Sequence, residues 1–311
     1  MLSYNNKKIA FKSKNTKKFV ITTVAAAVVL SFSVGIGVHL YNSSRNGSTV
    51  TYANVPVTNS NISGEGSVNG GTKVVKPLTG TVKGDGKNVG ALKDYEVKFE
   101  DIYKKDGVKT AFLTFDDGPT KNITPQILDI LDRYNIKASF FIVGNMAEKY
   151  PDMLKKEYES GHAINLHSYS HDYNYIYSSA EAFQGDLEKN IAAIKKALGE
   201  DFSTRIYRFP GGSYGKTRAP YKQQLANLGY VHIDWNALTK DAENINDKGH
   251  KRARTAPELL EELKKTIAES GNPEDLVILM HDAATKQPTA DELPHVIEYL
   301  KSQGYNFKTM K

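Results

Sequence analysis

The sequence contains no cysteine and only one tryptophan in 311 residues. Without cysteine the chain has no disulfide framework, no catalytic thiolate and no thiolate-ligated metal. Any metal site must therefore use histidine, aspartate or glutamate. No G-x-G-x-x-G fingerprint or phosphate-binding loop follows any predicted strand, so the usual sequence signals of a nucleotide-binding enzyme are missing.

Most of the chain also has no excess of basic over acidic residues. Of the 41 Lys and Arg and 35 Asp and Glu, twelve bases and three acids precede residue 95, which leaves 29 bases against 32 acids in 95–311. The formal charge of +6 therefore belongs to the N-terminal part. A nucleic-acid-binding domain needs a basic face, so we expect no nucleic-acid partner, and no protein partner is evident.

A run without charge, residues 19–38, follows six lysines within residues 1–18. A helix of that length spans about 30 Å, the thickness of a bilayer core, and the lysines favour a cytoplasmic N-terminus. We expect a cytoplasmic tail (1–18), a single-pass membrane anchor (19–40) and the rest of the chain outside the cell. The alternative is a cleaved signal peptide, which would leave the protein secreted. Residues 41–94, rich in Gly, Ser, Thr and Asn, indicate a flexible extracellular linker.

Residues 95–311 read as one α/β domain in which short apolar runs alternate with amphipathic segments. The predicted strands are Thr110–Phe115, Ala138–Val143, Ala163–His167, Ile206–Phe209, Tyr230–Trp235, Leu276–His281 and Asn306–Met310. Helix starts are predicted from capping boxes at 178–181, 255–258 and 289–292, and from Thr124 before Pro125. This pattern predicts parallel strands in a barrel or an open sheet.

Polar side chains end or follow five of the predicted strands, and they favour the barrel. They are Asp116 and Asp117, His167, Arg208, Asp241, and His281. Active sites of (β/α) barrels are built at the carboxyl ends of the strands. We therefore expect these side chains to meet at one rim.

The paired aspartates and the paired histidines together indicate a metal site. Adjacent carboxylates such as Asp116 and Asp117 are costly without a positive partner. His167 and His171, four residues apart, face the same way on a helical turn and can share one cation. Two histidines and one carboxylate leave open positions for water, as in catalytic metal sites. Each feature alone has an ordinary alternative: a polar turn, a chance spacing or, for His281, a core histidine.

In combination these residues resemble the five motifs of the polysaccharide deacetylases, carbohydrate esterase family 4, in the family's order. The motifs are Thr-Phe-Asp-Asp-Gly from 114, His-x-x-x-His from 167, Arg-x-Pro-Gly-Gly from 208, the following Asp241, and Leu-x-His from 279. The resemblance covers about residues 108–311. It implies a distorted (β/α) barrel, in agreement with the strand pattern.

The resemblance also implies a role for each matching residue. Asp116 would be the general base, with Arg208 orienting it, and His281 the general acid, with Asp241 tuning it. Gly211 would offer an oxyanion N–H, and Leu279 would line the acetyl pocket. The implied ligands of one divalent metal, usually zinc and sometimes cobalt or nickel, are Asp117, His167 and His171.

The implied reaction is hydrolysis of N-acetyl groups on a polysaccharide. The expected anchor places the enzyme at the cell wall, so peptidoglycan N-acetylglucosamine is the favoured substrate. Chitin oligomers, exopolysaccharide and acetylated xylan stay open as substrates. A catalytically silent wall-glycan binding protein and a metal hydrolase of another bond are the rival interpretations.

Three positions depart from the family pattern. Asn165-Leu166 stands where the family has Gly-Asn, Gly211 where an aromatic residue often follows the proline, and Ala242 where an aromatic residue usually follows the aspartate. The last two weaken the expected aromatic wall of the groove, so they bear on substrate choice more than on chemistry. The sole tryptophan, Trp235, is expected to pack in the core.

Overall fold

A computed structural model describes residues 92–247 and 250–311. The predicted tail (1–18), anchor (19–40) and all but the end of the linker (41–94) lie outside the described residues. Among the residues described, no helix is long and apolar enough to cross a membrane.

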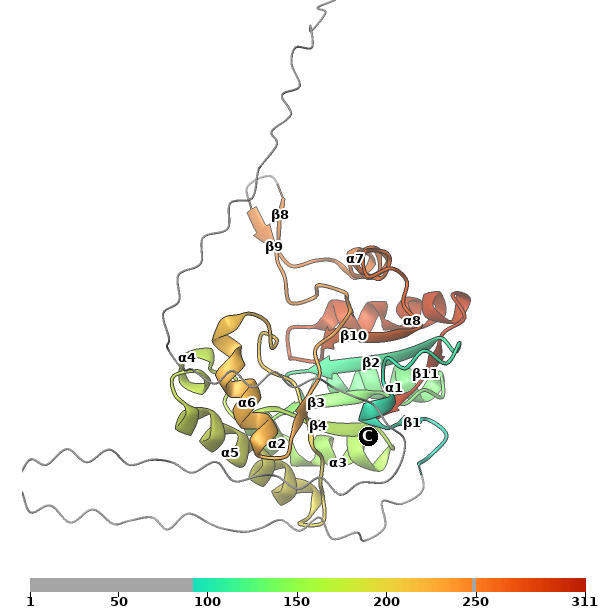
Figure 1. Ribbon diagram of the computed structural model, residues 1–311. Coiled ribbons are helices and arrows are strands. Elements are labelled where there is room, and N and C mark those ends of the chain that lie inside the picture. The colour runs from blue at the N-terminus through green and yellow to red at the C-terminus, as the bar shows by residue number, and fades with distance from the viewer. Residues whose placement is uncertain (1–91, 248–249) are drawn as a thin grey trace, which may run out of the picture. The chain divides into compact units, whose positions relative to one another are not determined.

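A sheet of parallel strands forms the centre of the domain (Figure 1). Its eight strands follow the order β6-β5-β4-β3-β2-β10-β7, with β11 beside β2. Their bounds are β2 Thr110–Asp116, β3 Ser139–Val143, β4 Ala163–Ser168, β5 Ile206–Tyr207, β6 Val231–His232, β7 Ala237–Leu238, β10 Asp275–His281 and β11 Asn306–Phe307. The predicted α/β class with parallel strands is confirmed.

The sheet is curled, and its two edge strands, β6 and β7, follow one another directly along the chain. β6 pairs with β5, β7 pairs with β10, and only Ile233–Asn236 separate them. β6 and β7 do not pair with each other, so the sheet is a curled, incompletely closed barrel. The predicted strand Tyr230–Trp235 was too long, because the chain leaves β5 after Ile233 N–H donates to the Tyr207 carbonyl.

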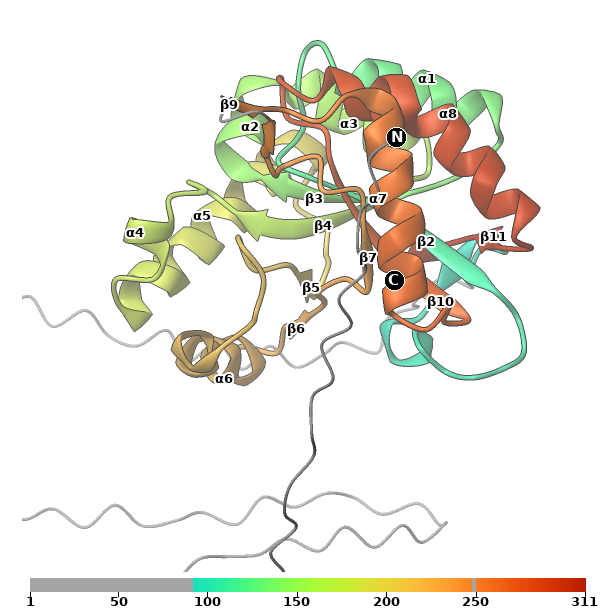
Figure 2. The same ribbon diagram turned by 90° about the horizontal axis from the view of Figure 1, so that it is seen from above.

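Helices surround the outside of the curled sheet (Figure 2). They are α1 Thr124–Arg133, α2 Gly144–Lys149, α3 Pro151–Glu159, α4 Tyr173–Ile176, α5 Ala180–Leu198, α6 Ala219–Asn227, α7 Ala256–Glu269 and α8 Gln287–Ser302, with 3-10 turns η1 Phe99–Asp101 and η2 Lys216–Arg218. The strands thus have a helix-covered outer face and an enclosed inner face.

The predicted helix starts had mixed outcomes. The capping box of Thr255 and Glu258 is present at α7. Ser179, not Ser178, caps α5 by accepting a hydrogen bond from Ala182 N–H. The box predicted at 289–292 is wrong because α8 already begins at Gln287, which places Thr289 inside the helix. Thr124 is the first residue of α1 rather than its cap.

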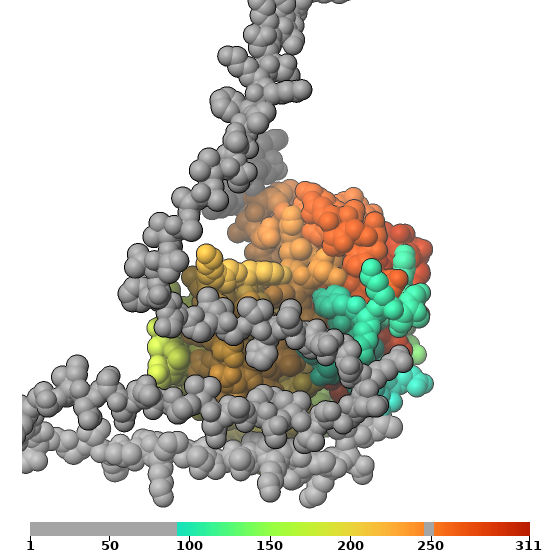
Figure 3. Space-filling view, viewed as in Figure 1, coloured from blue at the N-terminus to red at the C-terminus, as the bar shows by residue number. Residues whose placement is uncertain are grey.

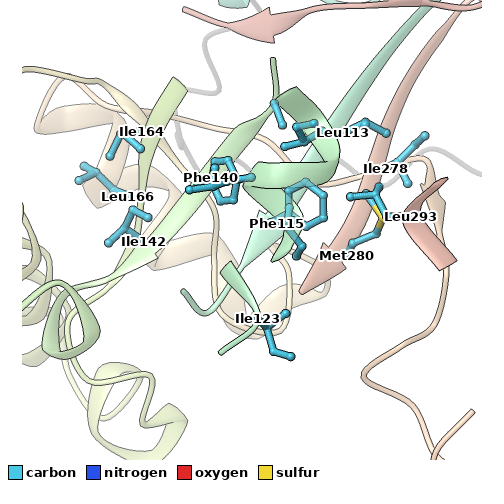
Figure 4. Close-up of a cluster of buried hydrophobic side chains, with 14 of the residues drawn as sticks. Leu113, Phe115, Ile123, Phe140, Ile142, Ile164, Leu166, Ile278, Met280 and Leu293 are labelled. Carbon is cyan, nitrogen blue, oxygen red and sulfur yellow. The ribbon is translucent and has the colours of Figure 1, made fainter. Parts of the chain in front are cut away.

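Side chains alternate between the two faces of each strand. Leu113 and Phe115 of β2 belong to the large outer core under the helices, together with Phe140, Ile142, Leu166, Ile278 and Met280 (Figure 4). Phe112 belongs to a smaller inner cluster with Ile102, Phe141, Ile206, Ile233, Val277 and Met310. Because Thr114 and Asp116 share the inner face with Phe112, the sheet directs them into the barrel.

The first and last described segments lie together at the base of the barrel, the end at which the strands begin. β1 (Glu96–Val97) pairs in parallel with β12 (Thr309–Met310), and Phe99 N–H donates to the Lys311 carbonyl. In the space-filling view the first described segment (cyan) lies beside the C-terminal one (red) (Figure 3). The predicted strand Asn306–Met310 is therefore split into β11 and β12.

A hairpin that was not predicted follows the Asp241 loop. β8 (Ile245–Asp247) pairs antiparallel with β9 (His250–Arg252), and the hairpin projects from the body of the domain (Figure 1). It lies outside the main sheet. Its short polar strands carry no apolar alternation, so periodicity gave no signal for it.

Candidate active site

A cavity of about 260 Å³ opens where the carboxyl ends of the strands meet. Its lining includes eight of the nine site residues predicted from sequence: Asp116, Asp117, His167, His171, Gly211, Asp241, Leu279 and His281. The ninth, Arg208, is fully buried directly behind Asp116. The predicted side chains therefore meet at one site.

Asp117, His167 and His171 bring three donor atoms together. Asp117 Oδ1 lies 3.6 Å from His167 Nε2 and 3.1 Å from His171 Nε2, and the ligand atoms of the three residues lie within 4.8 Å of one another. The prediction that the histidines share a helical turn is wrong: His167 is the penultimate residue of β4, and His171 has a left-handed backbone with φ of 55°. The turn after β4 brings the rings together.

These donors fit a divalent metal ion. His167 Nδ1 lies 2.8 Å from the Arg208 carbonyl, which fixes a proton on Nδ1 and leaves the Nε2 lone pair facing the site. Burial, and then the neighbouring His171, lower the pKa of His167 to about 3, so its ring is neutral. No hydrogen bond reaches the buried Asp117 Oδ1 from any other described residue. A carboxylate oxygen and imidazole nitrogens are typical ligands of zinc.

Asp116 is buried against the guanidinium of Arg208. Arg208 Nη1 donates to Asp116 Oδ1 at 2.8 Å and to Thr114 Oγ1 at 2.7 Å, and Nε donates to the Ile233 carbonyl at 3.2 Å. Burial raises the pKa of Asp116, and the Arg208 charge opposes that rise. The carboxylate is held in one orientation, with Oδ2 3.9 Å from His167 Nε2.

His281 is held by the carboxylate of Asp241. His281 Nδ1 lies 2.8 Å from Asp241 Oδ1, and the His281 backbone N–H donates to Oδ2 at 2.8 Å. Burial lowers the pKa of His281, but the Asp241 charge and hydrogen bond raise it by more, to about 9. His281 is therefore an imidazolium at neutral pH and can donate a proton.

Other residues of the site were missed by the sequence analysis. Thr289 Oγ1 donates to Asp241 Oδ2 at 2.8 Å, a contact hidden by the capping box predicted there. Tyr173 lines the cavity from α4. Trp235 contacts the inner cluster, in line with the expected core role, but it also lines the cavity. No spacing rule connects these positions to the motifs.

Two of the three departures from the family pattern, Asn165-Leu166 and Ala242, differ in whether they line the cavity. Asn165 and Leu166 are buried within β4, where Asn165 Oδ1 accepts a hydrogen bond from Thr204 Oγ1 at 3.2 Å. They do not line the cavity. Ala242 does line it, so the missing aromatic side chain at 242 leaves the wall open at that point.

Comparisons with known proteins agree with this geometry. The sequence profile described as "Polysaccharide deacetylase" matches residues 103–233. The peptidoglycan-N-acetylglucosamine deacetylase PgdA of Listeria monocytogenes is 31% identical over 69% of this chain, which spans only 41% of the length of that relative. Among solved structures, a Streptococcus mutans CE4 esterase has 34% identity and a TM-score of 0.62, over 70% of this chain and 92% of that one.

A second solved structure is the catalytic domain of a peptidoglycan N-acetylglucosamine deacetylase from Eubacterium rectale. It is 31% identical, with a TM-score of 0.56, and the similarity covers 68% of this chain and 92% of that one. Both structural relatives are covered almost completely at more than 30% identity, and the five motifs meet in one cavity. The chain therefore belongs to the polysaccharide deacetylase family, carbohydrate esterase family 4.

Proposed function

We propose that this chain is a metal-dependent N-deacetylase of a cell-wall polysaccharide, and that its substrate is the N-acetylglucosamine of peptidoglycan. The observation that carries the proposal is the meeting of a three-donor metal site, a buried carboxylate and an imidazolium around one cavity. The relatives named as peptidoglycan N-acetylglucosamine deacetylases support this choice of glycan.

The proposed metal ligands are Asp117, His167 and His171, and zinc is the proposed ion, with cobalt or nickel as substitutes. A divalent ion held there supplies Lewis acidity, which lowers the pKa of a water molecule and polarises an amide carbonyl. The three protein ligands leave coordination positions open, as a catalytic site requires.

Asp116 and His281 are the proposed base and acid. Asp116 accepts the proton of the attacking water, and Arg208 keeps its carboxylate turned toward the cavity. The N–H of Gly211 is free to bind the oxyanion, since it donates to none of the described residues; one such donor is typically worth about 3–4 kcal/mol. His281 then protonates the leaving amine, and Leu279 faces the acetyl methyl group.

The proposed acid predicts the effect of pH on an Asp241→Asn variant. Turnover needs protonated His281, so it falls as pH rises through the pKa of His281. Asp241 raises that pKa, whereas burial lowers it. Removing the Asp241 charge is expected to shift the alkaline limb of the kcat–pH profile to lower pH by about one to three pH units. An unchanged limb in this variant would assign it to a group other than His281.

We further propose that the domain works outside the cell, attached through the apolar segment 19–38. The lysines of residues 1–18 and the apolar run itself support this location. Cleavage after that segment would instead release the enzyme as a secreted protein. The membrane and the wall polysaccharide are the proposed partners.

Acetate release tests the proposed function directly. The purified full-length chain, loaded with zinc, is expected to release acetate from peptidoglycan and from N-acetylglucosamine oligomers. Comparison with acetylated xylan separates amide from ester substrates. A metal-loaded protein that releases no acetate from any N-acetylated glycan would favour the silent glycan-binding alternative.

A further inference from the structure

Two glycines in the loop after β5 leave room for aromatic rings beside the cavity. A Cβ atom on Gly211 would lie 3.1 Å from Cε2 of Tyr173. A Cβ atom on Gly212 would lie 2.7 Å from Cδ2 of Tyr214 and 3.2 Å from the Trp235 ring. Both glycines have positive φ, 75° and 84°, which side chains rarely adopt. The loop therefore carries no side chain at these two positions, where the rings of Tyr173, Tyr214 and Trp235 lie close to its backbone.

The Tyr173 ring contacts two neighbouring aromatic rings although 45% of the residue is exposed. Asp172 caps α4 by accepting hydrogen bonds from Asn174 and Tyr175 N–H. The ring lies 5.3 Å from the His171 ring and 6.2 Å from the Tyr177 ring. Tyr177 is anchored in turn, because its hydroxyl donates to the Pro210 carbonyl at 2.8 Å. The same contacts therefore hold α4 and the glycine loop together.

Beside Gly212, the rings of Tyr214 and Trp235 meet edge to face with centroids 5.8 Å apart. Tyr214 is 56% exposed, while Trp235 lines the cavity with Tyr173. Aromatic rings with one apolar face open to solvent and a polar group at the edge suit ligands that are apolar on one side and polar around the rim. Pyranose rings have this character.

We propose that Tyr173 is a substrate-positioning residue, which supplies from α4 the aromatic wall that residue 211 lacks. Its ring packs on the sugar unit adjoining the one whose N-acetyl group reacts, and Tyr214 with Trp235 forms the facing wall. The inference rests on the proposed function and names its substrate class: a glycan chain of several units. The weakening expected from Gly211 is thereby offset by a residue of α4 that lies outside the five motifs.

This arrangement predicts a dependence on substrate length. A monomer occupies only the reacting position, so the Tyr173 ring adds little to its binding. A longer oligomer reaches the ring and gains binding free energy before the chemical step. Such uniform binding lowers KM and leaves kcat nearly unchanged. Loss of the ring should therefore raise KM for long oligomers only.

Steady-state kinetics of full-length variants tests the inference. With the N-acetylglucosamine pentamer, Tyr173→Ala is expected to raise KM about tenfold, equivalent to about 1.4 kcal/mol, with kcat within about twofold of wild type. Tyr173→Phe keeps the ring and should match wild type. Tyr175→Ala is the matched control, because Tyr175 lies on the same helix, is 42% exposed and does not line the cavity.

Two results would overturn the inference while the deacetylase function stands. One is an unchanged pentamer KM in Tyr173→Ala. The other is an equal loss of kcat with dimer and pentamer accompanied by loss of bound zinc, which would show that the ring only supports His171. Metal content of each variant, measured by elemental analysis, separates these cases.

Binding separates failure of the inference from failure of the proposed function. Trp235 is the only tryptophan of the chain and lines the cavity, so its fluorescence reports occupancy. If wild type releases no acetate, the deacetylase proposal fails, but pentamer titration still tests Tyr173. An affinity about tenfold weaker in Tyr173→Ala than in Tyr175→Ala supports its positioning role, and equal affinities overturn it.

Discussion

Replacing Asp116 by asparagine is expected to lower kcat by about 10²- to 10⁴-fold, the usual contribution of a general base. The amide cannot accept the proton of the attacking water. Its carbonyl oxygen can still accept the 2.8 Å hydrogen bond from Arg208 Nη1, so the side chain keeps its place. The ligands Asp117, His167 and His171 are untouched, and metal content should stay at one ion per chain.

Asp117→Asn is the matched variant, because it makes the same replacement, a carboxylate by an amide, at the adjacent residue. It is expected to lose both metal and turnover, since Asp117 Oδ1 faces both histidine rings. Acetate release and elemental analysis of the two variants, with circular dichroism to check folding, distinguish base from ligand. Wild-type turnover in Asp116→Asn would remove Asp116 from the mechanism.

Removal of the metal by a chelator is expected to abolish turnover and to lower Tm by roughly 5–10 °C. A ligand present at a hundred times its Kd stabilises the native state by about 2.7 kcal/mol, and a domain of this size shifts by about 2–4 °C per kcal/mol. An ion at the proposed site would also offset the negative charge of Asp117. One equivalent of zinc should restore both properties.

The thermal readout makes this test independent of the reaction. His171→Ala should abolish the zinc-dependent rise in Tm measured by scanning calorimetry. His295→Ala, which alters an imidazole that is 70% exposed on α8, should keep the rise. A zinc effect of equal size in His171→Ala would place the ion elsewhere on the protein.

The strands and the rim of polar residues could be predicted because both depend on local signals. Residues 110–116 include four apolar residues among seven and are buried throughout, as expected of a strand covered on both faces. Parallel strands place their carboxyl ends together, so Asp116, His167 and His281 could be assigned to one rim without knowing any distance. The structure confirms that rim.

The remaining features depend on contacts between distant segments. The short β6 and β7 are set by their pairing with β5 and β10, which the local pattern of residues 230–238 does not contain. Thr289 matched a capping box, yet its hydroxyl is used 48 positions away in the sequence, at Asp241. Tyr173 fills space over Gly211, and no sequence rule links an absent side chain to the residue that occupies its volume.

The position of β1 fixes where the described chain enters the domain. Thr309 N–H donates to the Tyr95 carbonyl, so the described chain enters at the base, where the strands begin. β2 has seven residues, and at about 3.3 Å per residue the rim lies roughly 20 Å away. The segment that enters the domain and the cavity therefore lie at opposite ends of the strands.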